Sequence, residues 1–270
     1  MKLRLNPDPL NLTLATITFV LFFLPGKHQY PYRPEKAIKN IVIVHGAFAD
    51  GSGFEAIHQI LTKKGYTVTI VQNSCTSLEE DVAATNIILN KQDGPTILVG
   101  HSWGGTVISQ AGISPMVAGM VYIEGFLPEV GETTVQLASS EPPVPGSGAL
   151  QPDESGWIYY PKAQYHSGFC GDLSKEQSDF MYDSQVPITL KCFTTPATVA
   201  AWKDKPTWGI VSTGDKSINP IILKNMYKRA GTTVTELDAS HVVYISQPVK
   251  VAKVIESAAI GAASKAGTKD

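Results

Sequence analysis

Three features are scarce in this sequence: cysteine, net charge and long apolar runs. Cysteine occurs only at Cys75, Cys170 and Cys192 in 270 residues, which is too few and too scattered for a disulfide framework or a zinc site. One disulfide would be compatible with an exported protein, and the sequence does not indicate which pair would form it. The net charge is -2, so no basic field attracts nucleic acid, and that class of partner is excluded.

The N-terminus carries the chain's main candidate for a targeting segment. Lys2 and Arg4 precede an apolar run over residues 10–24, which is shorter than the roughly 20 residues of a membrane-spanning helix and is interrupted by polar residues. A basic start before such a run is typical of a secretory signal. We therefore expect residues 1–26 to be a signal peptide or membrane-anchor-like leader, followed by a linker over 27–38. The protein would then be secreted, periplasmic or anchored to a membrane, in the last case through the leader only; otherwise it would be cytoplasmic.

From residue 39 onward, strand-like and helix-like segments alternate. Continuous apolar runs predict buried strands at 40–46, 66–72, 96–100, 117–126, 207–215 and 232–241. Helical spacing of apolar residues lies between them, at 52–65, 77–92, 105–112, 219–231 and 248–264. Ser77 is the expected N-cap of its helix, with Glu80 completing a capping box. This alternation predicts an α/β fold with a mostly parallel sheet that helices cover on both faces.

Residues 128–205 interrupt the alternation. The stretch 139–161 is rich in Pro, Gly and Ser, and short helices are expected at 173–185 and 195–205. This segment is too long for a simple connection, so we interpret it as a cap inserted in one domain that spans residues 39–262. Residues 263–270 are the expected C-terminal tail.

The pentapeptide Gly-His-Ser-Trp-Gly at 100–104 fits the pattern G-x-S-x-G. It lies between a predicted strand and a predicted helix, which is where a nucleophile elbow holds its serine on a tight bend. The neighbouring glycines remove side chains that would clash at such a bend. Ser102 is therefore the candidate nucleophile; the alternative is a glycine-rich helix start that binds an anion.

A serine hydroxyl needs a base, and the base needs an acid that orients it. His241 follows the last predicted strand, at the sheet edge that also carries Ser102, and is the candidate base. Asp215 follows the preceding strand, which satisfies the chain order Ser, Asp, His. Glu124 ends another strand and is the second candidate for the acid; Asp238 is too close to His241 along the chain.

The anion formed during acyl transfer requires two backbone donors. One is expected from the amide of Trp103, directly after the nucleophile, and the other from the loop after the first strand. Ala47 is the first candidate in that loop and Phe48 the second. We expect His45 to brace the loop rather than to react.

Several blocks, in order, resemble the α/β-hydrolase superfamily, in particular small bacterial serine esterases distantly similar to plant methyl-ester esterases and hydroxynitrile lyases. The blocks are IVIVHGAFADGSGF, TSLEEDVAATNIIL, QDGPTILVGHSWGGTVISQAG, TGDKSINP and ASHVVYISQP, within residues 38–262. The resemblance implies an α/β-hydrolase fold with a small helical cap, no cofactor and no metal. It places Ser102, Asp215 and His241 on a catalytic triad, and Ala47 and Trp103 on the oxyanion donors.

The resemblance also separates hydrolysis from lyase chemistry. The resemblance implies that the lyase branch uses a lysine beside the histidine and a hydroxyl residue in the His-Gly loop, where this sequence has Val242 and Ala47. We therefore expect a carboxylic-ester hydrolase that forms an acyl-enzyme on a small-molecule ester. The alternatives are a ligand-binding protein on a hydrolase scaffold, and an acyltransferase or thioesterase with the same residues.

The substrate pocket is expected between the elbow and the cap, lined by aromatic and apolar side chains. The principal candidates are Phe48, Phe126, Leu127 and Trp157, followed by Tyr159, Tyr160, Phe169, Phe180 and Met181. Such a lining favours a small or medium apolar acyl or aryl ester.

Overall fold

The computed structural model describes residues 37–148 and 150–266. The expected leader (1–26), nearly all of the linker (27–38) and the end of the tail lie outside the described residues, so those expectations stay predictions. The last helix, α10 (Pro248–Ala266), continues into the expected tail. No helix in the described part of the chain combines the length and hydrophobicity needed to cross a bilayer.

A six-stranded parallel sheet forms the centre of the fold, in the order β2-β1-β3-β4-β7-β8. The strands are β1 (Asn40–Val44), β2 (Thr67–Val71), β3 (Thr96–His101), β4 (Val117–Ile123), β7 (Thr207–Ser212) and β8 (Thr233–Leu237). Each lies within or beside a predicted run, and the predicted fold class is confirmed. Most predictions extend past the carboxyl end of the strand, into the loops that carry Glu124, Asp215 and His241.

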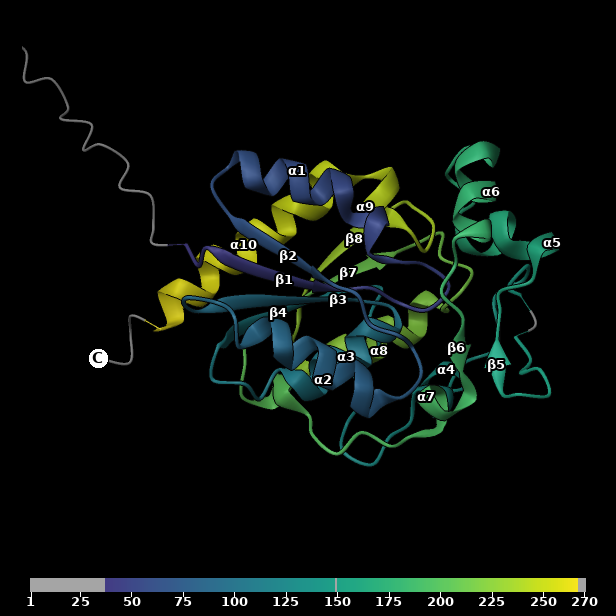
Figure 1. Ribbon diagram of the computed structural model, residues 1–270, viewed down its shortest axis with the longest axis horizontal. Coiled ribbons are helices and arrows are strands. Elements are labelled where there is room, and N and C mark those ends of the chain that lie inside the picture. The colour runs from purple at the N-terminus through teal and green to yellow at the C-terminus, as the bar shows by residue number, and fades with distance from the viewer. Residues whose placement is uncertain (1–36, 149, 267–270) are drawn as a thin grey trace, which may run out of the picture. The chain divides into compact units, whose positions relative to one another are not determined.

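Helices cover both faces of the sheet (Figure 1). The 3₁₀ turn η1 (Gly51–Phe54) and α1 (Glu55–Lys63) lie with α10 on one face. On the other face lie α2 (Leu78–Leu89), α3 (Trp103–Ala111) and α8 (Pro220–Ala230). Ser77 caps α2 as predicted, since its hydroxyl accepts from the Glu80 amide at 3.1 Å. The Glu80 carboxylate accepts from the Thr76 hydroxyl, so the box itself does not form.

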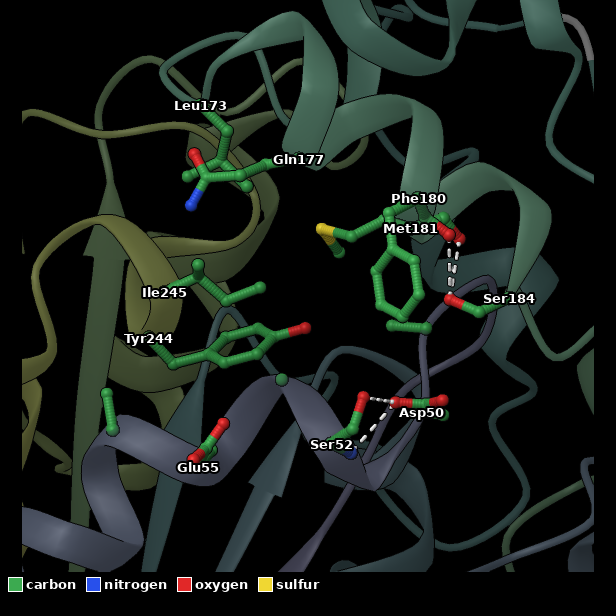
Figure 2. Close-up of a pocket in the computed structure, with 13 residues that line it drawn as sticks. Asp50, Ser52, Glu55, Leu173, Gln177, Phe180, Met181, Ser184, Tyr244 and Ile245 are labelled. Carbon is green, nitrogen blue, oxygen red and sulfur yellow. Dashed lines mark hydrogen bonds between the residues drawn. The ribbon is translucent and has the colours of Figure 1, made fainter.

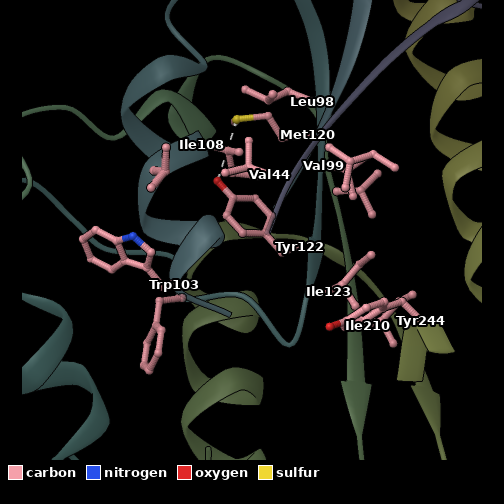
Figure 3. Packing of buried hydrophobic residues seen from close by; sticks show 14 of the residues in the cluster. Val44, Leu98, Val99, Trp103, Ile108, Met120, Tyr122, Ile123, Ile210 and Tyr244 are labelled. Carbon is pink, nitrogen blue, oxygen red and sulfur yellow. Dashed lines mark hydrogen bonds between the residues drawn. The ribbon is translucent and has the colours of Figure 1, made fainter. Parts of the chain in front are cut away.

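The core lies between the sheet and these helices, where branched strand residues are completely buried (Figure 3). Two buried hydroxyls within it pair with each other. The hydroxyl of Tyr122, on β4, bonds the hydroxyl of Ser109, on α3, at 3.0 Å, and its ring packs among the apolar side chains. This rigid centre fixes the positions of the loops at the carboxyl ends of the strands.

The cap segment, residues 128–205, joins β4 to β7 and consists of short elements. They are α4 (Thr134–Ala138), β5 (Trp157–Ile158), α5 (Lys162–Gln164), the π-helix η2 (Tyr165–Phe169), α6 (Lys175–Asp183), β6 (Ile188–Thr189), α7 (Leu190–Thr194) and the 3₁₀ turn η3 (Ala201–Lys203). The antiparallel pair β5–β6 was not predicted. The helix predicted at 195–205 is wrong except for η3, because backbone groups there bond outside the segment: the Ala197 amide to the Glu132 carbonyl, and the Thr198 amide to the Gln110 side chain.

The three cysteines are buried free thiols. The disulfide that the sequence left open is therefore not formed. Burial, together with the nearby Asp81 charge, raises the pKa of the Cys75 thiol. Burial likewise raises the pKa of Cys192, to about 12. Such thiols stay protonated at neutral pH and act as small apolar side chains.

Candidate active site

Ser102 lies on the bend between β3 and α3, in a backbone conformation with φ 52° and ψ -119°. Positive φ is costly for a residue with a side chain and persists only where surrounding contacts enforce it. Here the Ser102 amide donates to the Ile123 carbonyl at 3.0 Å, and the Ser102 carbonyl accepts from the Phe126 amide at 3.1 Å. Both partners lie at or just beyond the end of β4, so the sheet itself holds the bend.

Glycines allow the chain segments to cross closely at this bend. A Cβ atom at Gly100 would lie 2.4 Å from the Gly104 carbonyl oxygen, and one at Gly104 would lie 2.6 Å from the Val44 carbonyl oxygen. A Cβ atom at Gly46 would lie 2.7 Å from the Cβ of Ser102. Side chains at these positions would push α3 and the loop after β1 away from the serine, as the motif predicts.

His241 and Asp215 meet at the sheet edge. The distance from His241 Nδ1 to Asp215 Oδ2 is 2.7 Å, and each residue is 1% exposed. The second oxygen of Asp215 accepts from the amides of Ser217 at 2.8 Å and Ile218 at 3.1 Å. Because the carboxylate occupies Nδ1, the neutral imidazole keeps its lone pair on Nε2. His241 and Ser102 line the same cavity.

His101 supports His241 from beneath, a contact that sequence reasoning missed. Its Nε2 lies 2.9 Å from the carbonyl oxygen of His241, and the two rings are 4.7 Å apart. Burial, and then the neighbouring His241, lower the pKa of His101 well below its usual value. A neutral His101 must therefore donate through Nε2–H to that carbonyl. The position of His101 beside Ser102 in the motif does not indicate a contact with His241, which lies 140 residues away in the chain.

Glu124, the second candidate for the acid, is elsewhere engaged. It is fully buried at the end of β4, and its Oε1 accepts from the Ser212 hydroxyl at 2.5 Å. Its Oε2 has no hydrogen-bond partner among the described residues. Burial, and then the charge of Asp215, raise the pKa of Glu124 well above its usual value. The structure therefore brings Asp215, and not Glu124, to the imidazole.

The amides of Trp103 and Ala47, the first candidates for the oxyanion donors, differ from the amide of Phe48, the second candidate in the loop. Trp103 is the first residue of α3, so its amide has no acceptor within the helix. Ala47 lines the cavity with Ser102, and its amide makes no hydrogen bond to another described residue. The amide of Phe48, the second candidate, already donates to the Val186 carbonyl at 2.8 Å. His45 is buried beside them, with Nδ1 2.9 Å from the Gly46 carbonyl, and burial lowers its pKa.

A buried carboxylate fixes the Trp103 side chain, and sequence reasoning missed it too. Asp81 Oδ2 accepts from the indole Nε1 of Trp103 at 2.8 Å and from the Asn73 amide at 3.2 Å. Its Oδ1 accepts from the Cys75 backbone amide at 2.9 Å. In the sequence, Asp81 resembled any acid in the first turn of a helix. Only its complete burial distinguishes it.

A cavity of about 380 Å³, called the first cavity, lies between these residues and the cap. It is lined by Ala47, Phe48, Ser102, Trp103, Phe126, Thr134, Val135, Ala138, Leu150, Gln151, Pro152, Ile158, Tyr160, Phe169, Leu190, Phe193, Ser217, Ile218 and His241. Apolar side chains predominate. Four of the predicted lining residues are therefore in place: Phe48, Phe126, Tyr160 and Phe169.

The other predicted lining residues are wrong for this cavity. Leu127 is fully buried behind it, where its backbone bonds Met226 and Arg229. Trp157 lies on β5, paired with Thr189, outside the lining. Tyr159 is also absent from it and is exposed, and Phe180 and Met181 line a different cavity.

Comparisons with known proteins show the family and the fold. The sequence pattern of the Alpha/beta hydrolase family matches residues 41–254. A carbendazim-hydrolysing esterase from Nocardioides sp. (strain SG-4G) is 25% identical over 171 residues, which cover 57% of this chain and 67% of the relative. A pyrethroid hydrolase from Sphingobium wenxiniae is 25% identical over 252 residues, covering 81% and 86%. A crystal structure of a pyrethroid hydrolase superposes with a TM-score of 0.70 at 24% identity, covering 82% of this chain and 96% of the other.

Proposed function

We propose that this chain, which belongs to the alpha/beta hydrolase family, hydrolyses carboxylic esters through an acyl-enzyme on Ser102. The observation that carries the proposal is the 2.7 Å contact between His241 and Asp215 beside a cavity that Ser102 also lines. Two relatives of this chain are named as an esterase that hydrolyses carbendazim and as a pyrethroid hydrolase. The site geometry and the two relatives together support the broader conclusion that the chain is an ester hydrolase.

In the proposed reaction, the Ser102 oxygen attacks the acyl carbon while Nε2 of His241 takes the hydroxyl proton. Asp215 holds the imidazole through Nδ1 and stabilises the imidazolium. The amides of Ala47 and Trp103 donate to the anionic oxygen of the tetrahedral intermediate, each contributing about 3 kcal/mol. His241 then gives the proton to the leaving alcohol. Water, deprotonated by His241, attacks the acyl-enzyme and restores the serine.

The size and lining of the first cavity support a small or medium ester with an apolar acyl or aryl part. Its walls are chiefly Phe, Leu, Ile, Val and Trp side chains around the reacting groups. Such a wall gives affinity through apolar burial and leaves orientation to a few polar atoms.

The test is replacement of the nucleophile. Ser102→Ala removes the attacking oxygen, so turnover of p-nitrophenyl acetate should fall by about 10³-fold or more. Thr213→Ala, which removes an exposed hydroxyl outside the lining of the first cavity, is the matched control and should keep wild-type kcat. Turnover retained in the Ser102 variant would end the proposal.

A reactive-serine probe separates hydrolysis from ligand binding on an inactive scaffold. A fluorophosphonate should label the wild type at Ser102 and leave Ser102→Ala unlabelled; absence of labelling would favour a binding protein. Acyl transfer and thioester cleavage would use the same residues. Adding an alcohol or a thioester to the assay, with product analysis, distinguishes these reactions from hydrolysis.

A further inference from the structure

A second cavity, of about 430 Å³, lies between η1 and α1 of the domain, α6 of the cap and the short helix α9 (Val243–Ser246) (Figure 2). It is lined by Ala49, Asp50, Ser52, Gly53, Glu55, Ala56, Leu173, Gln177, Phe180, Met181, Ser184, Tyr244 and Ile245. None of these residues lines the first cavity. Phe48 faces the first cavity and Ala49 the second, so the loop that carries Ala47 separates them.

A buried hydroxyl without a partner points into the second cavity. The Tyr244 side chain is completely buried, and its ring stacks on Phe54 at 4.2 Å between centroids. Its hydroxyl has no hydrogen-bond partner among the described residues, and it is directed into the space between Ser52 and Met181 (Figure 2). Burial raises the pKa of this phenol, which is therefore a neutral donor. A buried donor of this kind is ordinarily paired, and an acceptor atom of a bound molecule would pair it.

The cavity floor is negatively charged. Asp50 and Glu55 both line it, while none of its lining residues in the described chain is Lys, Arg or His. Oδ1 of Asp50 accepts from the amide and the hydroxyl of Ser52, at 2.8 and 2.5 Å. Glu55 Oε1 accepts from the neutral Gln59 amide at 2.9 Å. Neither carboxylate has a cationic partner among the described residues, so the floor favours a positively charged group.

The wall opposite the floor carries large apolar side chains. Phe180 and Met181 project from α6 toward the cavity, and Ile245 lies across from them (Figure 2). Phe180 is 68% exposed, although an aromatic ring gains most from burial. A ligand with an apolar body would cover this ring, and the ring face would also attract a cation.

We propose that the second cavity binds a small organic amine that also carries a hydroxyl or carbonyl oxygen. The ammonium group lies at Asp50 and Glu55, the oxygen accepts from Tyr244, and the hydrocarbon part packs on Phe180 and Met181. This site goes beyond the proposed ester hydrolysis and does not depend on it.

Three related probes test each contact by calorimetry on the full chain: phenylalaninol, 2-phenylethylamine, which lacks the hydroxymethyl group, and 3-phenyl-1-propanol, which lacks the amine. Phenylalaninol should bind tightest, by about fivefold over each of the others. Tyr244→Phe should lower its affinity to that of 2-phenylethylamine and leave the affinity of 2-phenylethylamine unchanged. Glu55→Gln should weaken both amines and not the alcohol, whereas Glu176→Gln, an exposed acid on α6 outside the lining, should change nothing.

Two results would overturn the site. One is that none of the three probes binds at millimolar concentration. The other is that phenylalaninol binds equally to Tyr244→Phe and Glu55→Gln and is displaced when Ser102 is phosphonylated, which places it in the first cavity. The calorimetry measures binding and not turnover. Its result can therefore be interpreted even if the chain does not hydrolyse esters. An unchanged thermal melting curve for Tyr244→Phe verifies that the variant is folded, and Phe180→Ala gives a second variant at the rim.

Discussion

The first cavity has two walls that are built differently. At the sheet edge, polar groups are held by directional bonds to buried partners: His241 by Asp215 through Nδ1 and by His101 through its carbonyl. The cap wall consists of apolar side chains on short helices, among them Val135 and Leu190, which are 40% and 39% exposed. Hydrogen bonds specify position and direction, whereas apolar contact is non-directional. The sheet-edge wall therefore fixes the chemistry, whereas the cap wall can vary with the substrate.

The largest effect on kcat should come from replacing Asp215, the acid of the sheet-edge wall. Asp215→Asn replaces the carboxylate that orients His241, so kcat for p-nitrophenyl acetate should fall by about 10³- to 10⁴-fold. Glu124→Gln is the matched control, because it changes the other buried acid of this edge, and its kcat should stay close to wild type. Equal losses in both variants would mean that the acid is wrongly assigned.

A smaller loss should follow at the carboxylate behind Trp103. In Asp81→Asn an amide N–H faces donors from Trp103, Asn73 or Cys75, so at least one buried donor loses its acceptor. Such a loss corresponds to about 1–3 kcal/mol, and we expect kcat/KM to fall by about tenfold or more. Trp103→Phe removes the indole donor, and a double-mutant cycle with Asp81→Asn measures the coupling. Strictly additive effects on kcat/KM would show that Asp81 does not act through Trp103.

The cap wall should change selectivity and leave the chemical step intact. Leu190→Ala enlarges the first cavity, so kcat/KM for longer acyl chains should rise relative to acetate by about fivefold to tenfold. The kcat for acetate should stay within about twofold, since Leu190 lies on α7 of the cap wall and none of the bonds that hold His241 and Asp215 involves it. A fall in acetate kcat as large as that of Asp81→Asn would contradict the division between the two walls.

The smallest effect concerns stability at the sheet edge. The pKa of Glu124 is raised in the folded state, so the native protein holds a proton that the unfolded chain releases above about pH 4.5. Stability from this group is therefore full below that pH and is lost as pH rises toward the folded pKa. Glu124→Gln removes the dependence, and its free energy of unfolding, measured in urea from pH 4.5 to 8, should decline less steeply than that of the wild type. Parallel curves would show that Glu124 is ionised in the native state.

The sheet and the elbow were predictable because their signals are local. The buried runs that form β1, β3 and β4 are continuous in sequence, and GHSWG lies between a strand and a helix. The pairing of Asp215 with His241 followed from chain order and the shared edge of the sheet.

The remainder depends on contacts between residues far apart in the chain. His101 and Asp81 gain their roles only from partners that folding brings to them, and no local pattern distinguishes them. In the cap, Trp157 and Leu127 had the right chemistry for a pocket wall, but their directions are set by strand pairing and by packing on α8. Aromatic composition predicted that a lining exists and not which side chains form it.

The backbone of Ser102 restricts what can ever serve as the attacking atom. At φ 52° a β-branched side chain meets its own main chain, so threonine is poorly accommodated there, while cysteine differs from serine in one atom and keeps the same shape. Exchange of oxygen for sulfur is thus the replacement that the bend accepts with a working nucleophile. Glycine would adopt this conformation with less strain than either, but it has no side chain and so could not attack an ester.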